Sequence, residues 1–254
     1  MTTQNILNYR VTGEGYPVVF LHGFLESNSM WESISTKLTG LQSICIELYG
    51  HGNSPNFKGS LSIKAIAEGV LQVIKKERIK KFAIVGHSLG GYVAIELQSL
   101  LSNSTCTHLI LLNSHPWKDS TIKKNERTQV ANIVRKNKSL FIKQAIPNLF
   151  KEAKDHPDSV KKLITEALSI DAESIANTTL AMRDRVDTSS ILLKMKEKLL
   201  IIQGEHDKLI PISKMKKFAD ENGFKLAVLS EAGHMSHIEC ESKVIQLIKS
   251  FIQL

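Results

Sequence analysis

A direct join between a strand and a helix constrains this fold more than any other feature of the sequence. Residues 82–85 are apolar and suit a buried strand, and from Leu89 to Leu101 the apolar residues recur at the spacing of a helix. The junction is the five residues Gly-His-Ser-Leu-Gly at 86–90. A turn this tight needs glycine where backbones crowd together. The same residues match G-x-S-x-G, a strained turn that exposes its serine above the strand end. A purely structural turn and a reactive Ser88 both fit the pattern.

Strand-like runs alternate with helical stretches along most of the chain, and this alternation predicts the fold class. The runs are residues 18–21, 43–48, 82–85, 109–112, 199–203 and 226–229. Such alternation indicates an α/β protein with a mostly parallel, doubly wound sheet and helices on both of its faces. Uninterrupted apolar runs such as LILLN and LLIIQ agree, because a strand covered on both sides needs no polar face.

One long segment interrupts the alternation. From Trp117 to Arg185 no strand is expected, and the sequence is polar, rich in lysine and helical in its periodicity. One apolar stripe consists of Val160, Leu163, Ile164, Ala167 and Leu168, and a looser one of Leu140, Phe141, Ala145, Leu149 and Phe150. Structureless loops of this length are rare, so the segment is expected to be helical. The sequence therefore predicts a core of residues 1–116 and 186–254 with a helical lid at 117–185.

Length, charge and cysteine usage narrow the class of protein. A chain of 254 residues, 42% of them hydrophobic, can bury a large core. The net charge of +8 arises from small lysine groups without interleaved aromatic residues, which argues against a nucleic-acid partner. The sequence has no run of 18 apolar residues and no leader-like start, so neither membrane insertion nor export is expected. Cys45, Cys106 and Cys240 lack metal-ligand spacing and are predicted to be free thiols in a cytoplasmic protein.

A reactive serine needs a base, and the base needs a carboxylate to orient it. Two segments supply such groups just beyond predicted strands, where open α/β sheets place their sites. LLIIQGEHDKLIP contains Glu205 and Asp207, and LAVLSEAGHMSHIE contains His234 and His237. The residues alone leave both choices open. No histidine or cysteine pairing suggests a metal site, and no glycine-rich turn matches a phosphate or dinucleotide loop, so no metal or cofactor is expected.

The order Ser, Asp, His, with a helical insertion before the acid, resembles the α/β-hydrolase family over nearly the whole chain. Two further motifs agree: LHGF at 21–24 resembles the oxyanion-hole loop of the family, and YGHGNS at 49–54 resembles its G-H-G-x-S turn. The resemblance implies that Ser88 is the nucleophile, His234 the base and Asp207 the acid that orients it.

The resemblance also implies how the substrate is held. The backbone N–H groups of Phe24 and Leu89 are expected to form the oxyanion hole, where such donors contribute about 3 kcal/mol each. The predicted substrate-binding residues are His22, Gly23, Phe24 and Leu89, with His22 also bracing the oxyanion loop.

Several polar residues near these motifs have predicted supporting roles. His87 and His206 are expected to make local hydrogen bonds rather than to act as bases. Glu47 stands where relatives usually carry aspartate before the G-H-G turn, and it is expected to order that turn. For the pair Ser114 and His115, lining the pocket and capping the sheet remain equal alternatives.

The implied activity is hydrolysis of a small carboxylic ester or related acyl bond through an acyl-enzyme. Similar members of the family include carboxylesterases, enol-lactonases, carbon–carbon bond hydrolases and a carrier-protein methyl ester esterase, which fold and triad do not separate. A receptor-like or lyase member with negligible hydrolysis is the alternative from another class. Residues 117–185 carry fourteen Lys and Arg against nine Asp and Glu. This excess is either a solvated helix surface or a feature that steers an acidic carrier protein.

Overall fold

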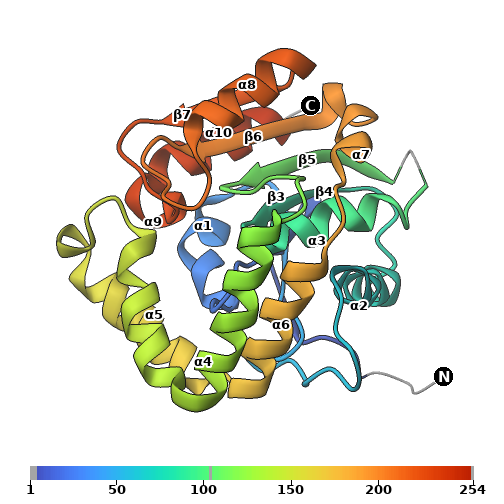
Figure 1. Cartoon of the computed structure of the whole chain (residues 1–254). Coiled ribbons are helices and arrows are strands. Elements are labelled where there is room, and N and C mark those ends of the chain that lie inside the picture. The colour runs from blue at the N-terminus through green and yellow to red at the C-terminus, as the bar shows by residue number, and fades with distance from the viewer. Residues whose placement is uncertain (1–4, 103–104, 253–254) are drawn as a thin grey trace.

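A seven-stranded sheet lies at the centre of the protein (Figure 1). The structure is a computed structural model that describes residues 5–102 and 105–252, so residues 1–4, 103–104 and 253–254 of the predicted core lie outside the described residues. The strand order is β1-β3-β2-β4-β5-β6-β7, and every neighbouring pair is parallel except β1 with β3. The strands are β1 (Tyr9–Thr12), β2 (Tyr16–Leu21), β3 (Leu41–Ile46), β4 (Phe82–His87), β5 (Cys106–Leu112), β6 (Leu199–Gly204) and β7 (Lys225–Leu229). The predicted fold class is confirmed.

Helices connect the strands and cover the sheet. They are α1 (Glu32–Lys37), α2 (Ile63–Lys76), α3 (Leu89–Gln98), α4 (Thr121–Ala145), α5 (Pro157–Ser169), α6 (Ala172–Asp184), α7 (Ser189–Leu193), α8 (Ile212–Asn222), α9 (Ser236–Glu239) and α10 (Glu241–Ile252). Four short 3₁₀ turns are η1 (Asn28–Trp31), η2 (Pro147–Leu149), η3 (Ala153–Asp155) and η4 (Lys196–Lys198). Across residues 5–102 and 105–252, none of the helices combines the length and the apolar character needed to span a bilayer.

The central strands are mainly apolar because each face of the sheet has its own hydrophobic core. On β2, Val19 and Leu21 pack into the core beneath α2, α3 and α8, whereas Val18 and Phe20 pack into the core beneath α1 and α10. The same alternation runs along β4, β5 and β6. Side chains of a strand point to opposite faces in turn, so a strand buried on both sides shows no polar alternation.

The segment between β5 and β6 folds into helices, as its periodicity predicts. Figure 1 shows α4, α5 and α6 grouped to one side of the sheet. On α5, Leu163 and Ala167 are buried in a third hydrophobic core, which confirms the stripe predicted there. This core also takes in Leu25 and Met235, from two loops at the carboxyl ends of strands. The helices of the insertion are therefore packed against the loops that carry the predicted site.

Some predicted boundaries and one predicted stripe differ from the structure. Leu140 is 50% exposed, because α4 kinks at Asn137, whose side chain caps the new turn by accepting from the Leu140 N–H at 3.0 Å. The kink changes the helical phase on which the stripe depends. The strand β3 starts at Leu41, not 43, and α3 ends at Gln98, not Leu101. The short edge strand β1 was not predicted, since four partly exposed residues carry little pattern.

A close backbone approach sets a testable limit on the first glycine of the strand-to-helix turn. A Cβ atom added to Gly86 would lie 2.5 Å from the Gly90 carbonyl oxygen and 2.6 Å from the Gly91 nitrogen, both of them backbone atoms. We expect Gly86→Ala to lower the free energy of unfolding by about 2 kcal/mol or more, because β4 and α3 must separate. Urea denaturation followed by circular dichroism measures this, with the exposed α8 substitution Ser213→Ala as control. An unchanged midpoint for Gly86→Ala would contradict the packing argument.

Candidate active site

Ser88 lies at the apex of the turn between β4 and α3. Its backbone has φ 48° and ψ −112°, a conformation that is strained for a residue with a side chain. The turn is held because the Ser88 N–H donates to the Leu112 carbonyl (3.0 Å) and the Ser88 carbonyl accepts from Ser114 Oγ (2.7 Å). The Ser88 side chain makes no capping bond to α3, so its hydroxyl is available to other groups. Ser114 therefore supports the turn from beneath.

The predicted base and acid meet this serine in one chain of hydrogen bonds. His234 Nε2 lies 2.9 Å from Ser88 Oγ, and His234 Nδ1 lies 2.8 Å from Asp207 Oδ2. A carboxylate only accepts, so Nδ1 carries the hydrogen and Nε2 presents its lone pair to the serine hydroxyl. The structure thus brings together three residues separated by up to 146 positions.

Asp207 is fixed by four further donors, two of which the sequence analysis missed. Its Oδ1 accepts from the N–H groups of Leu209 (2.8 Å) and Ile210 (3.1 Å). Its Oδ2 accepts from the side-chain amides of Asn113 (3.0 Å) and Gln203 (2.9 Å). Asn113 ends the run LILLN just as Gln203 ends LLIIQ, so a polar residue closing a buried strand was the available signal.

These donors decide the ionisation of the acid. Burial by itself would raise the pKa of Asp207, but its electrostatic interaction with His234 and the hydrogen bonds from His234 and Asn113 outweigh it, and the pKa lies well below its usual range. Asp207 therefore stays a carboxylate that only accepts hydrogen bonds, which keeps His234 in the orientation and tautomer described above.

The loop after β2 places the expected oxyanion donors. Within the described residues, neither the Phe24 nor the Leu89 N–H donates to a protein acceptor. His22 braces this loop as predicted: its Nδ1 lies 2.8 Å from the Gly23 carbonyl, and its Nε2 accepts from the Leu48 N–H at 2.9 Å. Both ring nitrogens of His22 are thus engaged within the protein, and of the four predicted substrate-binding residues only Phe24 lines the cavity described below.

A buried ion pair that the sequence analysis missed joins three loops of the site. Glu26 Oε2 accepts from the Gly23 N–H (2.7 Å) and from His87 Nδ1 (2.7 Å), while His87 Nε2 lies 3.0 Å from the His234 carbonyl. His87 thus meets an acceptor at each ring nitrogen, so both nitrogens carry hydrogen and the ring is a cation. The oxyanion loop, the turn before Ser88 and the His234 loop are held by this one pair.

The ionisation of the pair follows from its contacts. Burial by itself would raise the pKa of Glu26, but the charge of His87 and its hydrogen bond lower it to about 2. Burial by itself would lower the pKa of His87, but the charge of Glu26 and its hydrogen bond raise it. The third side chain here, His237, points one nitrogen toward Glu26 at 3.4 Å, and burial lowers its pKa to about 3. His237 is therefore a neutral, buried neighbour.

Glu26, His87 and His237 place metal-ligand atoms within 4.8 Å of one another. A metal would need a lone pair from His87, but both of its nitrogens donate hydrogen bonds, one to a carboxylate and one to a carbonyl. The hydrogen-bond chemistry of this cluster therefore fits an ion pair rather than a ligand set.

Glu47 orders the G-H-G turn, as predicted. Its Oε2 accepts from Asn8 Nδ2 and from the Asn53 N–H, both at 2.7 Å. Gly52 has φ +54°, and a Cβ atom there would lie 2.5 Å from Glu47 Oε2. The longer glutamate thus reaches the turn itself and leaves no room for a side chain at Gly52.

A cavity of about 810 Å³ opens in front of the serine and histidine. Its wall comes from the loops after the strands and from the insertion: Phe24, Leu25, Ser88, Tyr92, His115, Trp117, Val130, Phe141, Leu149, Met182, Ile210, His234 and Met235 are among its lining residues. The volume suits a small organic molecule, and most of these side chains are apolar. His115 is thus a lining residue, whereas its neighbour Ser114 supports the turn.

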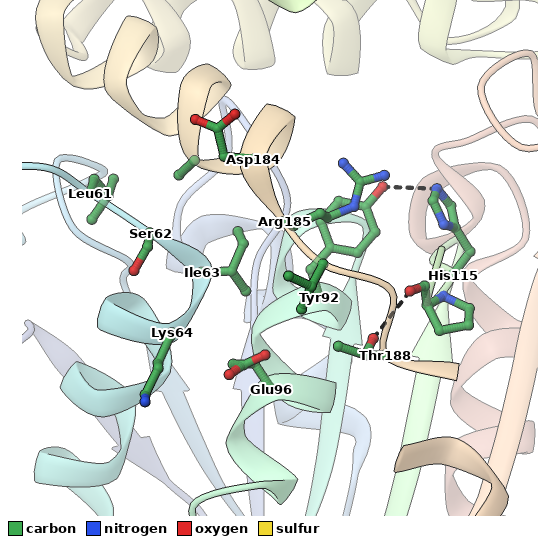
Figure 2. A pocket seen from close by; sticks show the side chains of 13 residues that line it. Leu61, Ser62, Ile63, Lys64, Tyr92, Glu96, His115, Asp184, Arg185 and Thr188 are labelled. Atoms are coloured by element: carbon green, nitrogen blue, oxygen red, sulfur yellow. Dashed lines mark hydrogen bonds between the residues drawn. The ribbon is translucent and has the colours of Figure 1, made fainter. Parts of the chain in front are cut away.

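A second cavity of about 220 Å³ shares Tyr92 and His115 with the first. Figure 2 shows the Tyr92 hydroxyl bonded to His115 Nε2 (3.1 Å) and Arg185 beside the Tyr92 ring, whose centre lies 4.3 Å from the guanidinium carbon. The hydrogen-bonded pair forms a common wall of the two cavities.

Fold and site define a class that comparison with known proteins identifies. The model of the alpha/beta hydrolase fold family matches residues 16–240. The chain belongs to that family.

The individual relatives have low sequence identity to this chain but match nearly all of it. A thermophilic esterase from Thermogutta terrifontis has a similar structure, with a TM-score of 0.90, 27% identity and coverage of 97% of this chain and 93% of that one. The pimeloyl-[acyl-carrier protein] methyl ester esterase of Aliivibrio fischeri is 25% identical over 99% of this chain and 98% of its own length. The chloroplastic protein PHYLLO of Arabidopsis thaliana is 26% identical over 94% of this chain, which spans only 15% of PHYLLO.

The Glu26–His87 pair predicts how stability depends on pH. His87 has a raised pKa in the folded protein, so its proton stabilises the fold fully below about pH 6.5, the usual value for histidine, and this contribution is lost as the pH rises through the folded pKa. We expect the free energy of unfolding of the wild type, relative to the double variant Glu26→Gln/His87→Gln, to fall as the pH rises above about 6.5. The slope for one proton is at most about 1.4 kcal/mol per pH unit.

Urea denaturation at half-unit pH steps measures this difference, and subtraction of the double variant removes contributions from other titrating groups. A difference that does not change with pH would show that His87 is not charged at the lower pH.

Proposed function

We propose that the protein is a serine hydrolase that cleaves small carboxylic esters through an acyl-enzyme. One observation carries this proposal: the Asp207–His234–Ser88 chain of hydrogen bonds opens onto an apolar cavity of about 810 Å³. A hydroxyl, a neutral imidazole and a carboxylate in this order are what activation of a serine requires. Membership of the alpha/beta hydrolase fold family supports this proposal.

The proposed reaction has two halves. Ser88 Oγ attacks the ester carbonyl carbon as its proton passes to His234 Nε2, and Asp207 stabilises the imidazolium that forms. The tetrahedral intermediate collapses, and the alcohol leaves with the proton from His234. Water then attacks the acyl-enzyme, giving its proton to His234, and the second collapse releases the acid and restores Ser88. The hydrogen-bonded geometry supports the transfer between serine and histidine, because Ser88 Oγ and His234 Nε2 already lie 2.9 Å apart.

The negative charge that develops on the carbonyl oxygen is proposed to bind the N–H groups of Phe24 and Leu89. Leu89 is the first residue of α3, whose first N–H groups have no partner within the helix and lie at its positive end. Phe24 follows Gly23, whose own N–H is already bound to Glu26. The ion pair thus holds the loop while leaving the next N–H for the substrate.

Residues 117–185 are proposed to act as the lid that closes over the ester. Four of the apolar lining residues, Val130, Phe141, Leu149 and Met182, come from this segment, and its core includes Leu25 and Met235 beside the catalytic loops. The similarity to the Thermogutta terrifontis esterase and the Aliivibrio fischeri methyl ester esterase supports an ester as substrate.

The proposal predicts that Ser88 is the single reactive serine of the folded protein. A fluorophosphonate probe is expected to add one label per chain, on the peptide that contains Ser88, and Ser88→Ala is expected to abolish it. The same variant is expected to lower kcat/KM for p-nitrophenyl butyrate by about 10⁴-fold or more, because nucleophile, base and acid act as a unit. Ser114→Ala, a change to the neighbouring serine beneath the turn, is the control and is expected to keep the label. Labelling elsewhere, or none in the folded wild type, would overturn the assignment, and labelling without turnover of any ester would favour a receptor-like protein.

The two buried histidines of the C-terminal segment are expected to differ sharply. His234→Ala removes the proposed base, so kcat is expected to fall by about 10³-fold or more with little change in KM. His237→Ala removes a neutral ring that contacts Trp31 and His87 but not Ser88, so its effect on kcat is expected to be within about tenfold. Steady-state kinetics with p-nitrophenyl butyrate measures both, and unfolding midpoints establish that both variants are folded. Equal losses would contradict the assignment of His234.

A further inference from the structure

The acidic side chains that line the active-site cavity are all neutralised within the protein. Glu26 is paired with His87, as described above. Glu126 accepts from Lys123 at 2.8 Å. Asp119 is bound by two guanidinium groups, with Arg185 Nη2 at 2.7 Å and Arg127 Nε on its other oxygen. The hydrogen bond from Arg185 and the charges of both arginines hold the pKa of Asp119 below its usual range against the effect of burial.

Three lysines of the same lining are not neutralised in this way. Among residues 5–102 and 105–252, no carboxylate lies within ion-pair distance of Lys118, Lys208 or Lys214. Lys208 Nζ donates to the Phe150 carbonyl at 3.1 Å, and all three side chains belong to exposed residues at the edge of the cavity. The cavity therefore carries a positive charge that the protein itself leaves uncompensated.

Lys118, Trp117 and Lys214 all line the active-site cavity. Lys214 Nζ lies 3.9 Å from the centre of the Trp117 ring, and Lys118 follows Trp117 in the chain. The Trp117 ring also contacts Phe218 edge-on at 5.3 Å and His115, which is stacked on it at 4.8 Å and 22°. The flexible ammonium of Lys214 is thus held over a flat surface that continues into the cavity.

The positive potential reaches the inner part of this wall. Burial, together with the charges of Arg185 and Lys214, lowers the pKa of His115 to about 3. Figure 2 shows Arg185 beside Tyr92, whose hydroxyl bonds His115 Nε2. A substrate anion entering along His115 and Trp117 would therefore meet cations from two elements, α8 and the segment after β5.

We propose that the substrate is an ester that carries an anionic group, a carboxylate or a phosphate, at the end remote from the scissile bond, and that Lys118 and Lys214 bind this group at the cavity mouth. The inference rests on the proposed function and deepens it, since it concerns the class of ester. An apolar middle portion suits the lining around Phe141 and Leu149, and the ester bond lies at Ser88.

The experiment compares matched esters on the wild-type protein. One p-nitrophenyl ester has an acyl chain that ends in a free carboxylate, and its partner is the same chain capped as a methyl ester. At about 50 mM salt we expect kcat/KM to be about tenfold higher for the free carboxylate, through a lower KM, and the ratio to approach one at about 500 mM because salt screens exposed charges. A third ester that ends in a phosphate distinguishes the two sources of the anion.

Three variants locate the effect. Lys118→Met and Lys214→Met are each expected to reduce the ratio of kcat/KM for the anionic over the neutral ester by about three- to fivefold, as loss of one exposed ion pair implies. Lys217→Met is the matched control: it lies on α8 three residues after Lys214, is exposed, does not line the cavity, and changes the net charge equally. Its ratio is expected to equal that of the wild type.

Two results would overturn the inference while leaving the proposed function intact: hydrolysis of the neutral ester with no preference for the anionic one, or a preference that neither cavity lysine affects. The same acyl group can also be attached to an acidic carrier protein. If the carrier-bound ester is preferred over the small anionic ester, and if Lys217→Met removes this preference as much as the cavity variants do, the lysines select a macromolecular partner and not a small-molecule anion. Failure to hydrolyse any of these esters would overturn the proposed function together with the inference.

Discussion

The close approach of β4 and α3 is the constraint on which the site depends. Gly86 lets the backbones of β4 and α3 touch, and Gly90 lets α3 touch the backbone at the end of β2. Between these two contacts Ser88 adopts a positive φ of 48°, and its side chain does not cap α3. Hydrogen bonds to the Leu112 carbonyl and from Ser114 Oγ hold the strained residue in place. The position of Ser88, the proposed nucleophile, is thus determined by the core of the protein.

The other functional groups are held by buried polar networks that cross between loops. Asp207 is fixed by amides that close two adjacent strands, and the Glu26–His87 pair joins the oxyanion loop, the serine turn and the His234 loop. A buried charge with its partner removed is costly, so each network is expected to respond as a unit to substitution. The charged groups at the cavity mouth differ, because water screens them and their effects on substrate selection are expected to depend on salt.

Local sequence patterns predicted the strands and helices well where burial of one or both faces decides which residues are apolar. The central strands are recognisable because both faces are buried, and the α5 stripe because one face is. The predictions failed where local pattern was weak: β1 is too short, and the Asn137 kink shifts the phase of α4 and exposes Leu140. Glu26 was missed because a lone acid in a loop has no signature in the sequence. Its side-chain partner, His87, lies 61 positions away, and its other partner is the backbone N–H of Gly23.

The sequence by itself determined the fold class, the turn that presents Ser88, and the segments that supply an acid and a histidine, because these depend on periodicity and on residues within a few positions of one another. The residues alone left His234 and His237, and Asp207 and Glu205, as alternatives, and the family resemblance selected His234 and Asp207. Only the tertiary structure shows that Asp207 meets His234 and that His234 meets the serine. It also decided that Ser114 supports the turn while His115 lines the cavity. The physical reason is that hydrogen bonds act over about 3 Å in space, and residues this close in the site are up to 146 positions apart in the chain.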